Sequence, residues 1–161
     1  MAKSFVEHII TKLEEAKTLY YRLLLVVGPC HSGKTAALQS LKEILSAPMI
    51  NVNLELSYRL LDLTERQRAL RLPRLLSQIV EAAIGNKAPE TVLLDNIEIL
   101  FDPSLKQDPL RLLQGLSRAN SVVAAWNGTV RDNSITYAVP GHPEYRHYPI
   151  DGFLVVDVML R

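Results

Sequence analysis

The sequence has little of what disulfide-stabilised or membrane-spanning chains need. Its 161 residues include one cysteine, Cys30, so no disulfide can form within the chain and a reducing compartment is favoured. No run approaches the roughly 18 consecutive apolar residues of a membrane-spanning helix. The N-terminal segment lacks the apolar core of a secretory leader, because polar and charged residues interrupt it: Glu7, His8, Lys12, Glu14 and Glu15. These absences predict a soluble, cytoplasmic protein without a membrane partner.

A large excess of charge of one sign is also missing. Lysine plus arginine total 18 and aspartate plus glutamate total 17, so the formal net charge is +1. This balance excludes a strong overall attraction to nucleic acid. One segment does concentrate basic residues, namely Arg59, Arg66, Arg68, Arg71 and Arg74. Because Asp62 and Glu65 lie among them, a solvated face is the better interpretation, and contact with DNA is the weaker one.

What is present is an alternation of short apolar runs and amphipathic stretches. Hydrophobic residues make up 48% of the chain, which excludes a disordered chain, and the length predicts a single domain, residues 1–161. We expect strands at 23–27, 49–52, 91–94, 121–126 and 153–158, and helices at 5–19, 34–45, 64–84 and 108–118. Because Pro73 lies inside the third of these helical stretches, we expect a kink there or two consecutive helices. Unbroken apolar runs are typical of strands that are buried on both faces. The pattern therefore predicts an α/β fold with a doubly wound parallel sheet.

The segment between the fourth and fifth expected strands breaks this alternation. Two β-prone runs, 135–139 and 144–148, flank a turn sequence at 140–143 that contains two prolines and a glycine. Proline and glycine at these positions favour a tight turn over a helix. We expect a hairpin-like insertion before the last strand.

The residues after the first expected strand carry the chemistry, because they match G-x-x-x-x-G-K-[ST], the phosphate-binding P-loop. The motif residues are Gly28, Pro29, Cys30, His31, Ser32, Gly33, Lys34 and Thr35, and Ala36 follows them. Its glycines let successive N–H groups face phosphate oxygens, and the following helix adds its positive N-terminal end. Lys34 would reach the β- and γ-phosphates, and the Thr35 hydroxyl would bind Mg²⁺. The Asn-Lys-x-Asp element that reads guanine does not occur in the sequence, so we expect ATP as the nucleotide.

Asp95 ends the third expected strand, where a P-loop site needs a second acidic group. Its carboxylate would hold Mg²⁺, directly or through water. The other interpretation is an aspartate that caps a turn. Together, Thr35 and Asp95 are the predicted Mg²⁺ ligands.

The stretch 92–95, followed by Ile97 and Glu98, resembles the Walker B stretch of AAA+ ATPases and their relatives. Those proteins usually carry Asp-Glu, and the glutamate polarises the attacking water. This chain has Asn96 after Asp95, and an asparagine cannot accept a proton. Glu98 could substitute only if the chain turns it back toward the γ-phosphate; otherwise it is a carboxylate that faces solvent.

Other positions extend this resemblance over residues 23–131. Asn127 ends the fourth expected strand, like the sensor-1 residue that contacts the γ-phosphate or the water, although an Asn-Gly turn is the alternative. Arg131 follows closely and is the best candidate for an arginine at the γ-phosphate, with Arg118 and Arg146 as weaker ones; an ordinary surface position is the better interpretation for each of the three. The resemblance implies the strand order 5-1-4-3-2. Because the sequence ends three residues after Val158, we expect no C-terminal helical lid.

The sequence as a whole resembles a smaller family, the short BrxF P-loop proteins of type 3 BREX bacteriophage-defence systems. The features that carry this resemblance are the chain length and the segments 95–101, 126–128 and 140–145. It implies a defence role and partner proteins from the same system.

Three functions fit these observations. The first is a nucleotide switch or weak ATPase that assembles with partner proteins, which the position of Asn96 favours because slow turnover is expected. The second is an active ATPase that works as a homo-oligomeric ring, with Arg131 or Arg118 of one copy serving the next. The third is a small-molecule kinase, for which no arginine-rich lid sequence is present.

Overall fold

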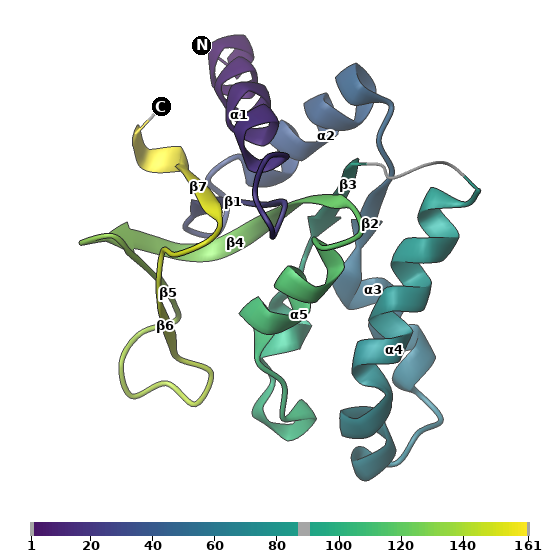
Figure 1. Ribbon diagram of the computed structural model, residues 1–161. Coiled ribbons are helices and arrows are strands. Elements are labelled where there is room, and N and C mark those ends of the chain that lie inside the picture. The colour runs from purple at the N-terminus through teal and green to yellow at the C-terminus, as the bar shows by residue number, and fades with distance from the viewer. Residues whose placement is uncertain (1, 87–90, 161) are drawn as a thin grey trace.

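The computed structural model describes residues 2–86 and 91–160. Its helices are α1 (Ala2–Ala16), α2 (Lys34–Leu45), α3 (Val52–Leu60), α4 (Glu65–Ile84) and α5 (Pro109–Leu116). Its strands are β1 (Leu23–Gly28), β2 (Met49–Asn51), β3 (Thr91–Asp95), β4 (Ser121–Arg131), β5 (Ser134–Tyr137), β6 (Arg146–Pro149) and β7 (Leu154–Asp157). Three short 3₁₀ helices are η1 (Glu98–Phe101), η2 (Pro103–Leu105) and η3 (Val158–Leu160). Figure 1 shows their arrangement.

Five strands form a parallel sheet in the order β2-β3-β4-β1-β7. Numbered along the chain, these five strands lie in the order 5-1-4-3-2 when read from β7. The pairing of β1 with β4 ends at Gly28 opposite Asn127, and that of β2 with β3 ends at Asn51 opposite Asp95. The carboxyl ends of these strands therefore meet at one edge of the sheet, which is where ligands bind in open α/β sheets.

Both faces of the sheet are covered by helices. The α1 and α2 helices pack on one face, and α3, α4 and α5 on the other (Figure 1). Side chains of β1 alternate between the two cores: Leu24 and Val26 join the first, while Leu25 and Val27 join the second. Alternate residues of a strand point to opposite faces, so burial on both sides needs an unbroken apolar run. The expected α/β fold with a mostly parallel sheet is confirmed.

The α-helix α3 was not predicted from the sequence. The helix α3 starts directly after β2, where residue 52 was expected to continue the strand. The Asn51 side chain caps it by accepting a hydrogen bond from the Leu54 N–H at 3.0 Å. An asparagine cap satisfies an N–H group that has no partner within the helix, and so favours a helix start at this point.

The alternative of two consecutive helices at Pro73 is wrong, since α4 is one helix that continues through this residue. Proline has no N–H group, so it cannot bond the carbonyl four residues earlier, which belongs to Ala69. The Gln107 side chain replaces that donor, with its Nε2 lying 2.8 Å from the Ala69 oxygen. This bond ties α4 to the segment that precedes α5.

The insertion before the last strand forms a β-hairpin, as expected, because β5 and β6 pair in antiparallel fashion. The expected end of the fourth strand at residue 126 is wrong, since β4 continues to Arg131 and also pairs with β5. Asp132 and Asn133 make the connecting turn, both with positive φ of 51° and 59°. Two such residues form the tight turn that best suits a hairpin, and asparagine and aspartate tolerate it. The result is a three-stranded arm, residues 127–149, which lies on the α5 side of the sheet (Figure 1).

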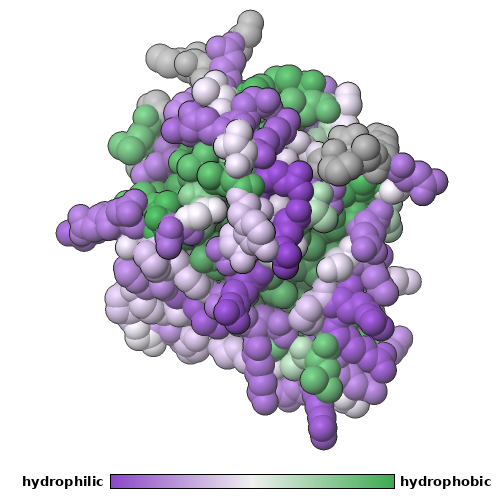
Figure 2. Space-filling model, viewed as in Figure 1, coloured by the Kyte–Doolittle hydropathy of each residue, from purple (hydrophilic) through white to green (hydrophobic). Residues whose placement is uncertain are grey.

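The surface seen in Figure 2 is mostly hydrophilic over α4 and α5, with hydrophobic side chains showing between hydrophilic ones and near the top of the view. Among the described residues, no helix is both long and apolar enough to span a membrane.

Candidate functional site

The glycine loop, residues 28–35, runs from the last residue of β1 into the first turn of α2 and leaves the start of α2 without a side-chain cap. His31 and Gly33 have positive φ of 62° and 95°, and Gly33 is the N-cap of α2 without any side-chain cap. The first N–H groups of a helix have no partner within it, so this helix start suits an anion. A Cβ added at Gly28 would lie 2.7 Å from the Ser32 hydroxyl oxygen and 3.0 Å from the Val158 Cβ, so both of these side chains would have to shift. The loop therefore depends on glycine at both ends.

Lys34 is buried inside this loop, with only 6% of its surface exposed. Its ammonium donates hydrogen bonds to the Gly28 and Pro29 carbonyls and to the Ser32 hydroxyl, the first at 2.9 Å and the last at 3.3 Å. Burial lowers the pKa of Lys34, and the nearby Cys30, Glu98 and Asp95 groups oppose that shift. An anion bound in the loop would compensate the buried positive charge.

Thr35 and Asp95 come together although sixty positions separate them in the sequence. The Thr35 hydroxyl donates a hydrogen bond of 2.8 Å to one oxygen of the Asp95 carboxylate, which is 6% exposed. The other oxygen accepts the Asn96 N–H at 3.0 Å. A hydroxyl and a carboxylate supply the oxygen ligands that Mg²⁺ prefers. Residues 2–86 and 91–160 contain no group of three or more His, Cys, Asp or Glu side chains suited to a metal, so phosphate oxygens and water would have to complete this coordination.

The chain turns sharply after β3 and carries Glu98 into the same pocket. Asn96 makes this turn with a positive φ of 53°, a conformation that asparagine tolerates better than most residues. Glu98 then starts η1 and lines the pocket together with Lys34 and Asp95. Burial raises the pKa of the Glu98 carboxyl; the negative charge of Asp95 adds to this, whereas Lys34 and backbone hydrogen bonds act in the opposite direction.

The pocket at the carboxyl edge encloses about 250 Å³. Its lining residues are Cys30, His31, Ser32, Gly33, Lys34, Thr35, Asp95, Asn96, Glu98, Ala125 and Asn127. The structure thus brings the predicted residues Lys34, Thr35, Asp95, Glu98 and Asn127 to one place. Gly28 and Pro29 start the loop and Ala36 follows it in the first turn of α2, without lining the pocket.

Asn96 and Ala125 line this pocket and were not expected to do so. The sequence carries a signal for Asn96, because an asparagine directly after a buried strand is a common left-handed turn residue. Ala125 carries no such signal, since it reads as one more apolar residue of β4. Its position follows from the register, which pairs it with Val26 of β1 near the carboxyl edge.

The predicted arginines lie elsewhere. Arg131 is at the far end of β4, where its side chain is 88% exposed and its Nε lies 3.9 Å from the Asp132 carboxylate. Arg118 is near the amino ends of the strands, with its guanidinium 5.2 Å from the centre of the Tyr20 ring. Neither arginine lines the pocket, so a role within the same chain finds no support for either one.

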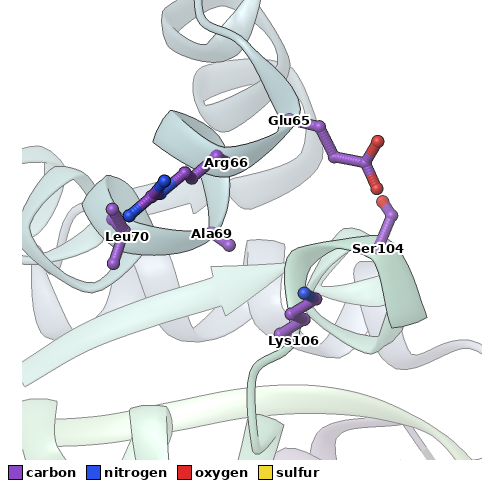
Figure 3. A pocket seen from close by; sticks show the side chains of 6 residues that line it. All are labelled: Glu65, Arg66, Ala69, Leu70, Ser104 and Lys106. Carbon is purple, nitrogen blue, oxygen red and sulfur yellow. The ribbon is translucent and has the colours of Figure 1, made fainter.

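A larger pocket, of about 510 Å³, lies between the start of α4 and η2. Figure 3 shows that Arg66, Ala69 and Leu70 line it from α4, while Ser104 and Lys106 face them. Glu65, Arg66 and Lys106 are all exposed there. Ionisable groups that are buried and brought together mark a reactive site better than exposed ones do, so the pocket at the carboxyl edge is the stronger candidate.

A scan against protein-family models finds no match for this chain, and a search of curated proteins finds no similar sequence.

Proposed function

We propose that this chain is a P-loop protein that binds Mg²⁺ and ATP at the carboxyl edge of its sheet. One observation carries the proposal: the buried Lys34 lies within the glycine loop while Thr35 and Asp95 meet at 2.8 Å beside it. A phosphate cradle, a cation and a pair of oxygen ligands are the parts that a nucleoside triphosphate and its metal ion require. The strand order 5-1-4-3-2, read from β7, supports the assignment to the AAA+-like P-loop class.

In this proposal each residue has one task. The N–H groups of the loop and of the first turn of α2 bind phosphate oxygens, and Lys34 neutralises the β- and γ-phosphates. Thr35 and Asp95 hold Mg²⁺, which spreads the charge of the phosphates when it is bound. Asn127 lies level with Gly28 at the end of the β1–β4 pairing, a position suited to contact with the γ-phosphate.

The biological output that we propose is a nucleotide switch or weak ATPase that assembles with partner proteins of a bacteriophage-defence system. The resemblance to the BrxF family supports the defence role. Asn96 supports slow hydrolysis, because the residue after Asp95 cannot accept a proton. ATP would then shift the equilibrium between assembly states through a difference in affinity for the two states.

The second candidate is an active ATPase in which one copy of the chain supplies an arginine to the site of another. The exposure of Arg131, at the tip of the β4–β5 turn, favours it. A homo-oligomer that forms only with ATP and loses its hydrolysis in Arg131→Ala would support this candidate over the switch.

Equilibrium binding of labelled Mg·ATP to the purified chain tests the site itself. We expect the wild type to bind, Lys34→Ala to lose affinity by about 100-fold or more, and Lys42→Ala to bind like the wild type. Lys42 is the matched control, because it is an exposed lysine on the same helix. Equal affinity of the wild type and Lys34→Ala would overturn the site assignment.

A further inference from the structure

The two carboxylates of the pocket have different surroundings. Both oxygens of Asp95 accept hydrogen bonds, one from the Thr35 hydroxyl and one from the Asn96 N–H. Glu98 lines the same pocket from the start of η1, close enough to Asp95 and Lys34 to feel their charges. Asp95 already accepts a hydrogen bond from the Thr35 hydroxyl, so it is suited to hold the metal together with Thr35. Glu98 is then the carboxylate that is available to accept a proton.

Packing of η1 helps to fix the position of Glu98 after the turn at Asn96. Phe101 lies one turn of η1 further on, and its ring stacks on the Tyr137 ring of β5 with centroids 3.6 Å apart and planes at 9°. The Trp126 ring meets Phe101 edge to face at 5.1 Å. Phe101 and Trp126 are buried, so the ring cluster holds η1 against the arm.

The arm is in turn fixed to the sheet at the same point. The Trp126 indole N–H donates a 3.0 Å hydrogen bond to the Thr136 carbonyl of β5. Gly128 allows this approach, because a Cβ there would lie 1.8 Å from the same carbonyl oxygen. Close contacts therefore connect β4 to β5 and β5 to η1. The last of them is made by Phe101, three residues after Glu98.

From this geometry we propose that Glu98 is the general base for the water that attacks the γ-phosphate, and that Tyr137 positions it by stacking on Phe101. The inference rests on the proposed function. It goes beyond that function by naming the base for the slow hydrolysis of the proposed weak ATPase, a carboxylate that lies three residues after Asp95 and reaches the pocket through the turn at Asn96.

The reaction balances with groups at the site. A Glu98 carboxylate oxygen accepts one proton from water while the water oxygen forms a bond to the γ-phosphorus. The bond from the γ-phosphorus to the bridging oxygen breaks, and ADP leaves with the electron pair. Glu98 then returns its proton to solvent, so the products are ADP, inorganic phosphate and one proton from ATP and water.

Glu98→Gln tests the base, with Glu43→Gln as the matched control on an exposed part of α2. Two quantities are measured with excess protein: the affinity for labelled Mg·ATP and the rate of phosphate release in a single turnover. We expect Glu98→Gln to bind ATP like the wild type and to release phosphate at least about 100-fold more slowly. Glu43→Gln should match the wild type in both quantities.

The outcomes separate this inference from the proposed function. Wild-type binding with equal phosphate release from Glu98→Gln overturns the base and leaves the nucleotide site intact. Wild-type binding without any phosphate release also overturns the base and leaves a pure switch. A wild type that does not bind ATP overturns the proposed function, and the base with it.

Tyr137 is tested by a graded pair of variants. Tyr137→Phe keeps the ring that stacks on Phe101, whereas Tyr137→Leu removes the ring but keeps an apolar side chain that fills much of the space. We expect Tyr137→Phe to release phosphate like the wild type and Tyr137→Leu to be at least about tenfold slower at unchanged ATP affinity. If a folded Tyr137→Leu, judged by its unfolding transition, released phosphate at the wild-type rate, the positioning role would be overturned.

Discussion

The glycine loop, with the hydrogen-bonded pair Thr35 and Asp95, differs from the β4–β5–β6 arm in what holds its residues in place. In the loop, eight consecutive residues place a buried cation, a hydroxyl and a helix start, and hydrogen bonds fix them. In the arm, residues that are distant in the sequence meet through aromatic stacking and one turn. Local backbone geometry therefore forms the proposed phosphate site, whereas packing between distant residues orients the carboxylate that we propose as the base.

The most disruptive variant is Gly128→Ala, which adds a side chain to β4 at the point where β5 passes close to it. The new Cβ would meet the Thr136 carbonyl oxygen at 1.8 Å, so β5 must move or the pairing must break. We expect the free energy of unfolding to fall by about 3 kcal/mol or more, measured by urea denaturation.

Gly115→Ala is the matched control for that variant. Gly115 lies in α5 with nothing within 4 Å of an added Cβ, and alanine is the better helix former by up to about 1 kcal/mol. Unchanged stability in Gly128→Ala would show that the Thr136 carbonyl of β5 does not lie this close to Gly128 of β4.

The next variant changes Asp95, one of the two proposed Mg²⁺ ligands, and its expected effect is on ATP binding. We expect Mg²⁺ to strengthen ATP binding to the wild type and this gain to fall by about 100-fold in Asp95→Asn, because an amide oxygen is a weaker ligand for a hard cation. Titration of ATP with and without Mg²⁺ measures the gain. Asp62→Asn, which changes an exposed aspartate, should keep the full gain; an equal gain in Asp95→Asn would remove Asp95 from the metal site.

Two hydrogen bonds to Asp108 stabilise the contact between the arm and α5, and we expect a smaller effect from removing them. The Tyr148 hydroxyl donates a 2.8 Å hydrogen bond to Asp108, and the same carboxylate caps α5 by accepting the Arg111 N–H. We expect Tyr148→Phe to cost about 1 kcal/mol of stability and Asp108→Ala about 2 kcal/mol, because the second variant loses the cap as well. Equal losses in chemical denaturation would contradict the shared role of Asp108.

The mildest test uses alkaline pH. Burial is the main cause that raises the pKa of Tyr137 to about 12 from 10.0, and burial with the Asp108 hydrogen bond raises that of Tyr148 as well. Between pH 10 and about pH 12, Tyr137 loses its proton in the unfolded chain but keeps it in the folded chain. The free energy of unfolding therefore falls as the pH rises through this range. We expect the near-ultraviolet tyrosinate signal to show late titration, with one fewer late group in Tyr137→Phe. An unchanged titration in that variant would contradict the burial of this ring.

The loop and its surroundings could be predicted from the sequence because their signals are local. The helix over 34–45 has the predicted bounds, and α4 follows its Thr64 capping box up to Gly85. Lys34, Thr35 and Asp95 meet where strand order and register require it.

The remaining features depend on contacts that no local pattern contains. The expected hairpin formed, but its pairing with an extended β4 depends on the Asp132-Asn133 turn and on the space that Gly128 leaves. The position of Glu98 depends on the left-handed backbone conformation of Asn96 and on the stacking of the Phe101 ring on the Tyr137 ring. The sequence alone left Glu98 as either a base or a solvent-facing carboxylate, because the direction of a turn is a tertiary property.

The most direct test of the central claim follows the fate of labelled Mg·ATP mixed with an excess of the wild-type chain, with Lys34→Ala as the control. We expect the wild type to retain the nucleotide and to convert it to ADP more slowly than about once per second, and we expect Lys34→Ala to retain none. A wild type that retains no label, or a Lys34→Ala chain that retains as much as the wild type, would contradict the claim that this edge of the sheet binds ATP.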